Sequence, residues 1–219
     1  MLKSSKHVFW EALLITVVVF FFGLLIGIAY EGSRLDEVNQ YYAVSEISLM
    51  DAFVLGSNTD LGNVSCSALI DSNIKFADRI YEEARILEQY EAAGKVTDSL
   101  KLAHKKYDLM RTFLWANSIR TLEKCGNDFD VIVYAYEYET RDLAKKATQN
   151  VWSKILYDLK QERGESIILI PIAVDSNLAS LDSLLDGFNI TQFPVVIINN
   201  KIVLSEVTSV SELENYLDK

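Results

Sequence analysis

Two cysteines are the residues of this sequence best suited to covalent chemistry. Cys66 and Cys125 form no Cys-x-x-Cys motif, and Lys124 is the only basic residue beside either of them. Little therefore favours a thiolate at neutral pH. The expected role is a structural disulfide. The alternative is an extracytoplasmic thiol-disulfide oxidoreductase or chaperone that uses this pair.

A helical hairpin brings the two cysteines together. Apolar residues recur at three- and four-residue steps from Ile70 to Leu87 and again from Leu100 to Leu122, with Gly94 between the two segments. Antiparallel packing of two such helices places Cys66 and Cys125 at the same open end. Closing a loop of this size restricts the unfolded chain by about 4 kcal/mol on the chain-entropy argument.

Other residue types capable of chemistry are few. His7 lies next to a long apolar run, and His104 stands alone on a predicted helix, so no metal-binding set forms. Glu137 and Glu139 could serve an unrelated enzyme, but they share one face of a predicted strand and are expected to be solvated. The sequence contains no Gly-rich phosphate loop and no Ser-His-Asp set. It therefore predicts no catalytic residue, no cofactor and no metal.

The N-terminal apolar run predicts a membrane anchor. Ala12 to Tyr30 contains no charge, and a helix of that length covers ~28 Å, about one hydrocarbon thickness. We assign residues 8–30 to a transmembrane signal anchor and residues 1–7 to the cytoplasm, because Lys3 and Lys6 precede the run and acidic residues follow it. The sequence therefore predicts a single-pass protein of the cell membrane whose C-terminal part is extracytoplasmic.

A cleaved signal peptide is the alternative, with Gly27-Ile28-Ala29 supplying small residues for cleavage. The apolar run is longer than a signal peptide requires, which favours the anchor. Gly23 and Gly27 form a GxxxG pair through which two such helices could approach as a homodimer, and an incidental pair is the alternative.

Charge and sequons indicate the compartment and the partners. With 21 Lys and Arg against 31 Asp and Glu, the net charge is −10, which argues against a nucleic-acid partner. Asn63 and Asn189 begin N-glycosylation sequons. Together with two cysteines outside the anchor, these sequons predict a glycoprotein in an oxidising extracellular compartment.

The pattern changes along the chain after the anchor. A helix is expected from about residue 35 to residue 55, followed by the hairpin, so that residues 31–127 form a helical stalk and hairpin region. Residues 128–219 then alternate between apolar β-forming runs and helical periods in the order β-α-β-α-β-β-α. Pro171, inside the second run, indicates an edge strand or a bulge. The predicted fold class is α/β.

The segment from Phe188 to Pro194, which leads into the strand Val195 to Ile198, resembles the thioredoxin-like superfamily over residues 129–219. The resemblance implies that Pro194 is a cis-proline and that Phe193 and Pro194 border a groove for an extended peptide. A trans proline at the first residue of a strand is the alternative. Asn189 replaces the usual glycine, and asparagine tolerates left-handed backbone geometry.

The residues that give this family its redox activity are missing. The family places a CxxC motif where the first strand meets the first helix, and here that junction runs from Tyr136 to Asp142 without a cysteine. Tyr134, Tyr136 and Tyr138 share one strand face, which is expected to pack under a helix, and stacking on a ligand is the alternative. The sequence therefore predicts a membrane-anchored, redox-inactive thioredoxin-like domain with an interaction or scaffold role and an unknown protein partner.

Overall fold

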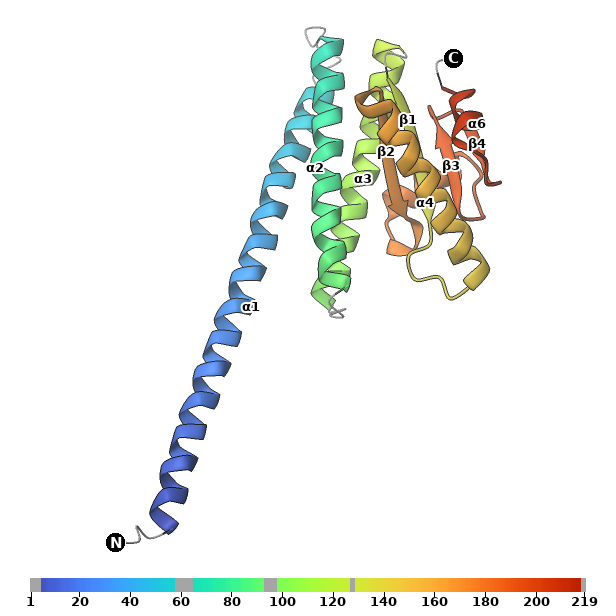
Figure 1. Ribbon diagram of the computed structural model, residues 1–219. Helices are drawn as coiled ribbons and strands as arrows, with labels where there is room; N and C mark the ends of the chain where they lie inside the picture. The colour runs from blue at the N-terminus through green and yellow to red at the C-terminus, as the bar shows by residue number, and fades with distance from the viewer. Residues whose placement is uncertain (1–4, 58–64, 93–97, 127–128, 218–219) are drawn as a thin grey trace. The chain divides into compact units, whose positions relative to one another are not determined.

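The computed structural model describes residues 5–57, 65–92, 98–126 and 129–217 (Figure 1). Contacts divide the chain into two compact units, Met1–Val44 and Ser45–Lys219. The helical hairpin and the sheet belong to the same compact unit. The fold is mixed α/β with an apolar N-terminal helix.

Helix α1 (Ser5–Ser57) contains the segment that the sequence predicts to be an anchor. Its segment His7–Tyr30 is long and apolar enough to cross a membrane, and none of it is buried. A separate helix over residues 35–55 was expected, but α1 continues unbroken to Ser57. Neither of the two prolines of the chain lies in this stretch, so helical hydrogen bonding can continue through it.

Helices α2 (Cys66–Ala92) and α3 (Asp98–Cys125) form the predicted hairpin, and Gly94 lies outside the described residues. The fully buried side of α2 carries Leu69, Asn73, Phe76 and Ile80. The predicted apolar face, one residue further along, is only partly buried, and Tyr81 on that face is exposed. The buried series was missed because the polar Asn73 interrupts its apolar pattern.

The sheet has the strand order β2-β1-β3-β4. Strands β1 (Asp130–Tyr136) and β2 (Ile167–Ala173) are parallel, and β3 (Val195–Ile198) and β4 (Ile202–Leu204) add antiparallel pairs. Helices α4 (Leu143–Arg163), α5 (Ala179–Gly187) and α6 (Val210–Glu214) complete the predicted β-α-β-α-β-β-α order. Pro171 lies in β2, which is an edge strand, as one of the two predicted positions for it.

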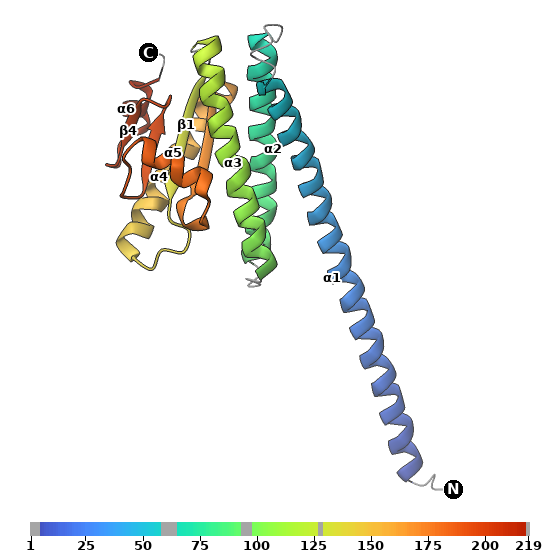
Figure 2. The same cartoon turned by 180° about the vertical axis from the view of Figure 1, so that it is seen from behind.

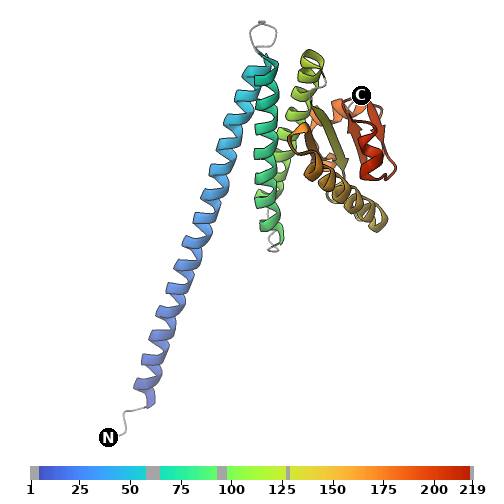
Figure 3. The same ribbon diagram turned by 45° about the horizontal axis from the view of Figure 1, so that its top comes forward.

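Helices cover both faces of the sheet. Helix α4 lies over one face in Figure 1, and the reverse view in Figure 2 shows α3 and α5 over the other. Figures 1 and 3 both place α3 between α2 and the sheet. Side chains of β1 alternate accordingly: Val131 and Val133 join the hairpin core, whereas Ile132 and Tyr134 join the α4 core.

The buried face of α4 is not the one that its apolar spacing suggests. Apolar residues recur at helical spacing at Leu143, Ala147, Val151, Ile155 and Leu159, but the first three of these are exposed. The buried residues are Gln149, Trp152, Leu156 and Leu159. As in α2, a polar residue lies in the buried series, so the apolar pattern does not reveal it. Gln149 can be buried because its amide bonds with a neighbouring loop described below.

Asparagines supply the backbone geometry that turns require. Asn189, Asn199 and Asn200 have φ values of 54°, 49° and 58°, so asparagine adopts the left-handed region where glycine is common. In the β3–β4 turn the Asn199 side chain also accepts a hydrogen bond from Val131 N and donates one to Asp130. A capping box of Ser209 and Glu212 begins α6.

Candidate functional site

The carboxyl ends of the parallel strands and the start of β3 meet at one edge of the sheet, here called the carboxyl edge. Strands β1 and β2 end at Tyr136 and Ala173. Val195 pairs with Ala135, so Pro194 lies at this same edge. The Phe193–Pro194 peptide bond is cis. Carboxyl edges of α/β sheets are frequent ligand sites.

The loop that follows β1 is held at its first three residues, Glu137, Tyr138 and Glu139, by side-chain hydrogen bonds. Gln149 Nε2 donates to the Glu137 carbonyl at 2.9 Å, and Glu137 N donates to Gln149 Oε1 at 3.1 Å. Tyr138 N and Glu139 N donate to the two carboxylate oxygens of Asp175 at 2.9 and 2.7 Å. These backbone donors are therefore already engaged by a carboxylate at the position where the thioredoxin-like pattern places its dithiol.

Helix α3 of the hairpin also contributes side chains to the carboxyl edge. The His104 and Tyr138 rings lie 4.7 Å apart, and His104 Nε2 is 3.4 Å from the Tyr138 hydroxyl. Lys101 Nζ approaches Glu139 Oε1 at 3.3 Å. Two residues of α3 thus contact the loop after β1.

A buried ion pair lies beneath these contacts. Arg111 Nη1 is 3.6 Å from Asp108 Oδ1, and the Arg111 guanidinium lies 4.0 Å from the centre of the Tyr107 ring. Asp108 Oδ1 also accepts a hydrogen bond from Ala173 N at 3.1 Å. Burial raises the pKa of Asp108, and Arg111 opposes that rise. The pair fixes α3 against the end of β2.

A cavity of about 260 Å³ opens at the carboxyl edge. Its lining includes Lys105, Asp108, Tyr138, Asp175 and Ser176. Ser176 has the only hydroxyl of serine or threonine in that lining, and its Oγ donates to a backbone carbonyl at 3.0 Å. The cavity offers charged and aromatic groups for binding. Among the described residues, no group of three or more His, Cys, Asp or Glu could hold a metal.

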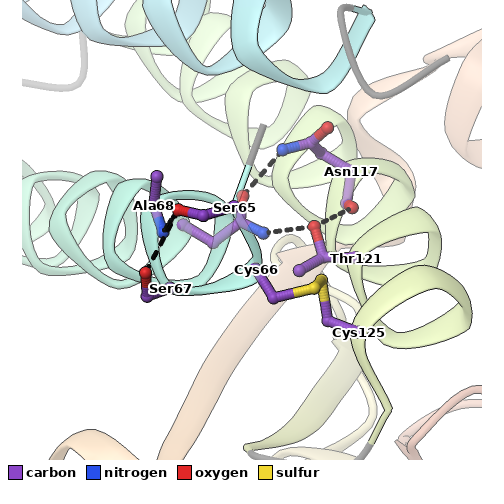
Figure 4. Close-up of a disulfide and its surroundings, with 8 residues drawn as sticks. Ser65, Cys66, Ser67, Ala68, Asn117, Thr121 and Cys125 are labelled. Carbon is purple, nitrogen blue, oxygen red and sulfur yellow. Dashed lines mark hydrogen bonds between the residues drawn. A yellow bond between two sulfur atoms is a disulfide. The ribbon is translucent and has the colours of Figure 1, made fainter. Parts of the chain in front are cut away.

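The two cysteines form a disulfide between the start of α2 and the end of α3 (Figure 4). Cys66 and Cys125 are half-buried, and their Cα atoms are 5.4 Å apart. Beside the bridge, Asn117 donates to Asn73 at 2.7 Å, and Asn73 donates to Thr121 at 2.9 Å. This buried polar network links the two helices and satisfies the amide groups.

The disulfide and the carboxyl edge lie near opposite ends of α3. His104 is 21 residues before Cys125, which corresponds to about 30 Å along a helix. The fold therefore does not bring the disulfide to Phe193 and Pro194.

The remaining residues singled out in the sequence lie elsewhere. Asn189 is exposed in the turn that follows α5, and Asn63 lies outside the described residues. A Cβ added at Gly23 or Gly27 would meet nothing within 4 Å. Tyr134 is buried under α4 and donates its hydroxyl to the Gln149 carbonyl at 3.0 Å, as expected for packing under a helix.

Sequence reasoning missed the contribution of α3 and Asp175 to the carboxyl edge. A usable signal was present, because Asp108 and Arg111 adjoin the apolar series of Tyr107, Met110 and Leu114. Charges next to a core face are rarely buried without partners. They could have been identified as a buried pair.

Comparisons of the chain with protein-family models, with curated proteins and with solved structures found no match. Interpretation of the carboxyl edge therefore depends on its own geometry and chemistry.

Proposed function

We propose that the chain is a membrane-anchored extracytoplasmic protein whose residues 129–219 form a redox-inactive thioredoxin-like domain with a protein-interaction or assembly role. The strand order β2-β1-β3-β4, with β1 and β2 parallel and β3 antiparallel to β1, supports this fold assignment. The supporting observation for the role is the carboxyl edge, where a fixed loop and a cavity lie at the same end of the sheet as Pro194 and no thiol is present.

The anchor and its orientation are part of the same proposal. The segment His7–Tyr30 has the length and composition of a single membrane span. Lys3 and Lys6 on its N-terminal side favour a cytoplasmic N-terminus. The Cys66–Cys125 disulfide suits an oxidising compartment on the other side of the membrane.

The proposed ligand of the carboxyl edge is an extended peptide segment of a partner protein. Tyr138 presents a partly exposed ring beside the cavity, and Phe193 is half-buried at the same edge. Leu143, in the first turn of α4, is 82% exposed. Tyr138 lines the cavity, and the other two apolar side chains lie outside its lining, so the carboxyl edge offers both polar and apolar groups to a peptide.

A matched pair of tyrosine substitutions tests this role. Peptides are selected from a random displayed library on the full-length chain in lipid nanodiscs, and their affinities are then measured by fluorescence anisotropy. Tyr138→Ala should weaken binding at least about tenfold, as loss of a central aromatic contact does. Tyr157→Ala, which removes a similarly exposed ring from α4, should leave the affinity unchanged.

A third variant separates recognition from the fold. Tyr138→Phe keeps the ring and should retain most of the affinity. Selected peptides that bind wild type and Tyr138→Ala equally well, or a library that yields no binder, would contradict an interaction role for the carboxyl edge.

A further inference from the structure

A group of large apolar side chains outside the predicted span is strongly exposed on two neighbouring helices. Ile47, Met50 and Val54 of α1 are 68%, 62% and 52% exposed, and Leu102 and Leu109 of α3 are 68% and 45% exposed. We refer to these five residues as the apolar patch. Scattered exposed apolar residues are normal, but a contiguous group of them marks an interaction surface.

Contacts between α1 and α3 place the five residues on one surface. Lys106 Nζ lies 2.5 Å from Glu46 Oε1, and the Phe53 and Phe113 rings are 6.0 Å apart. Both pairs join residues sixty positions apart, so the two helices run parallel here. Each residue of a helix is rotated by about 100° from the one before it, so the patch residues of α1 lie on one side of the residues that contact α3, rotated in one sense about the helix axis. The patch residues of α3 are rotated in the opposite sense from the residues that contact α1. Because the two helices are parallel and face each other, these opposite rotations place both sets on the same side of the pair.

We propose that a second copy of this chain covers the apolar patch and that the protein is a homodimer in its membrane. All copies anchored by the same span share one orientation, so a twofold axis along the membrane normal brings the same patch of each copy together. This inference rests on the proposed anchoring and is independent of peptide binding at the carboxyl edge.

The size of the patch favours a second copy over a soluble partner. Stable interfaces between soluble proteins use about 20 to 30 residues on each side, and the patch has five large apolar side chains. A partner from solution would therefore bind it weakly. Two chains held in one membrane meet at a high effective concentration, which allows a small interface to persist.

Charge gives the dimer an expected salt dependence. The chain carries a net charge of −10, so two copies repel each other at low ionic strength. Added salt screens this repulsion while leaving apolar contacts in place. The dimer fraction should therefore increase with salt concentration.

The test uses the full-length chain in lipid vesicles, with dimers counted by single-molecule photobleaching over a range of protein-to-lipid ratios. Replacement of both Ile47 and Met50 by glutamate should weaken dimerisation at least about tenfold, because it buries like charges in the interface. The matched control replaces Val151 and Tyr157 of α4, which are also exposed apolar residues, by glutamate. The control should dimerise like wild type.

A photo-reactive phenylalanine analogue provides a second readout that needs no destabilising charge. Placed at Met50 it should give a crosslinked dimer, and placed at Val151 it should not. The inference is overturned if wild type is monomeric at every protein density, or if the Ile47 and Met50 variant dimerises normally. It is also overturned if only Gly27→Leu, within the span, abolishes the dimer.

These outcomes remain separate from those of the peptide experiment. The apolar patch shares no residue with the carboxyl edge, so a failure of peptide selection leaves the dimer inference standing. Loss of the dimer likewise says nothing against peptide binding by Tyr138.

Discussion

Replacing Arg111 with methionine should destabilise the protein by about 3–5 kcal/mol at neutral pH. Arg111 is the counter-charge of the buried Asp108 carboxylate, and removing one partner of a buried pair leaves the other charge uncompensated. Methionine approximates the length of the aliphatic part of arginine, so the cavity contribution is small. The Ala173 N–H remains bonded to Asp108 but cannot replace a full positive charge.

The cost should shrink as the pH falls. Burial already raises the pKa of Asp108 above its unfolded value, and Arg111 opposes that rise, so the variant raises it further. Between the unfolded and folded pKa values the native state binds more protons than the unfolded state. A contribution of this sign increases stability as the pH falls through that window towards about 4. The penalty of an unpaired carboxylate disappears when the carboxyl group is protonated.

Urea unfolding of the full-length chain in detergent micelles, followed by tryptophan fluorescence at pH 7.5 and pH 4.5, measures both effects. Arg120→Met on the exposed side of α3 is the matched control and should change the free energy of unfolding by less than about 0.5 kcal/mol. Combining Asp108→Leu with Arg111→Met should recover most of the loss. A cost for Arg111→Met below about 1 kcal/mol, or one independent of pH, would refute the buried-pair reasoning.

Three further changes test other parts of the structure. Replacing Cys66 and Cys125 with serine should lower the free energy of unfolding by about 4 kcal/mol, measured by thermal unfolding, because the bridge closes a loop with a sequence separation of 59. Mass spectrometry with alkylation after graded reduction should find that the bridge resists reduction. Ready exchange of the bridge with a small peptide would favour the oxidoreductase alternative. Asn199→Ala should lower the free energy of unfolding, measured in urea, by about 2 kcal/mol. Asn199→Gly should lower it by less, because alanine is strained at a φ of 49° and glycine is not. The reverse ranking would contradict this account. In urea unfolding, Leu156→Ala should lower the free energy of unfolding by about 2–5 kcal/mol, and Leu143→Ala, at an exposed position, by less than about 0.5 kcal/mol. Equal losses would contradict the burial of Leu156 and the exposure of Leu143.

Local periodicity was sufficient to predict the element order but not every buried face. Apolar residues at three- and four-residue steps locate α2 and α4 along the chain, since that signal depends only on neighbouring residues. The buried sides were misjudged where a polar residue is satisfied by a distant partner. Asn73 bonds to Asn117 and Thr121, and Gln149 bonds to the backbone of Glu137. A hydrophobic count penalises such residues although they are buried.

The candidate site shows the same limit at longer range. Phe193 and Pro194 were accessible to sequence reasoning, because their resemblance to a known pattern is local. The contacts of Asp108 with Ala173 and of Tyr138 with Asp175 join residues 65 and 37 positions apart. Which charges meet across such separations depends on how α3 packs on the sheet, and no spacing rule along the chain encodes that packing.

Helix α3 carries residues of both proposed surfaces, so their independence is itself testable. His104 and Asp108 line the carboxyl edge, whereas Leu102 and Leu109 belong to the apolar patch. The disulfide fixes one end of α3, and Asp108 is bonded to the end of β2.

Coupling between two sites requires a second conformation that both ligands distinguish. A helix tied to the sheet, to α1 and to α2 offers no obvious second packing within the described residues. We therefore expect peptide affinity at the carboxyl edge to agree within about twofold between wild-type dimers and monomers carrying glutamate at Ile47 and Met50. A tenfold difference would show instead that α3 moves on dimerisation and transmits the change to the loop at Tyr138.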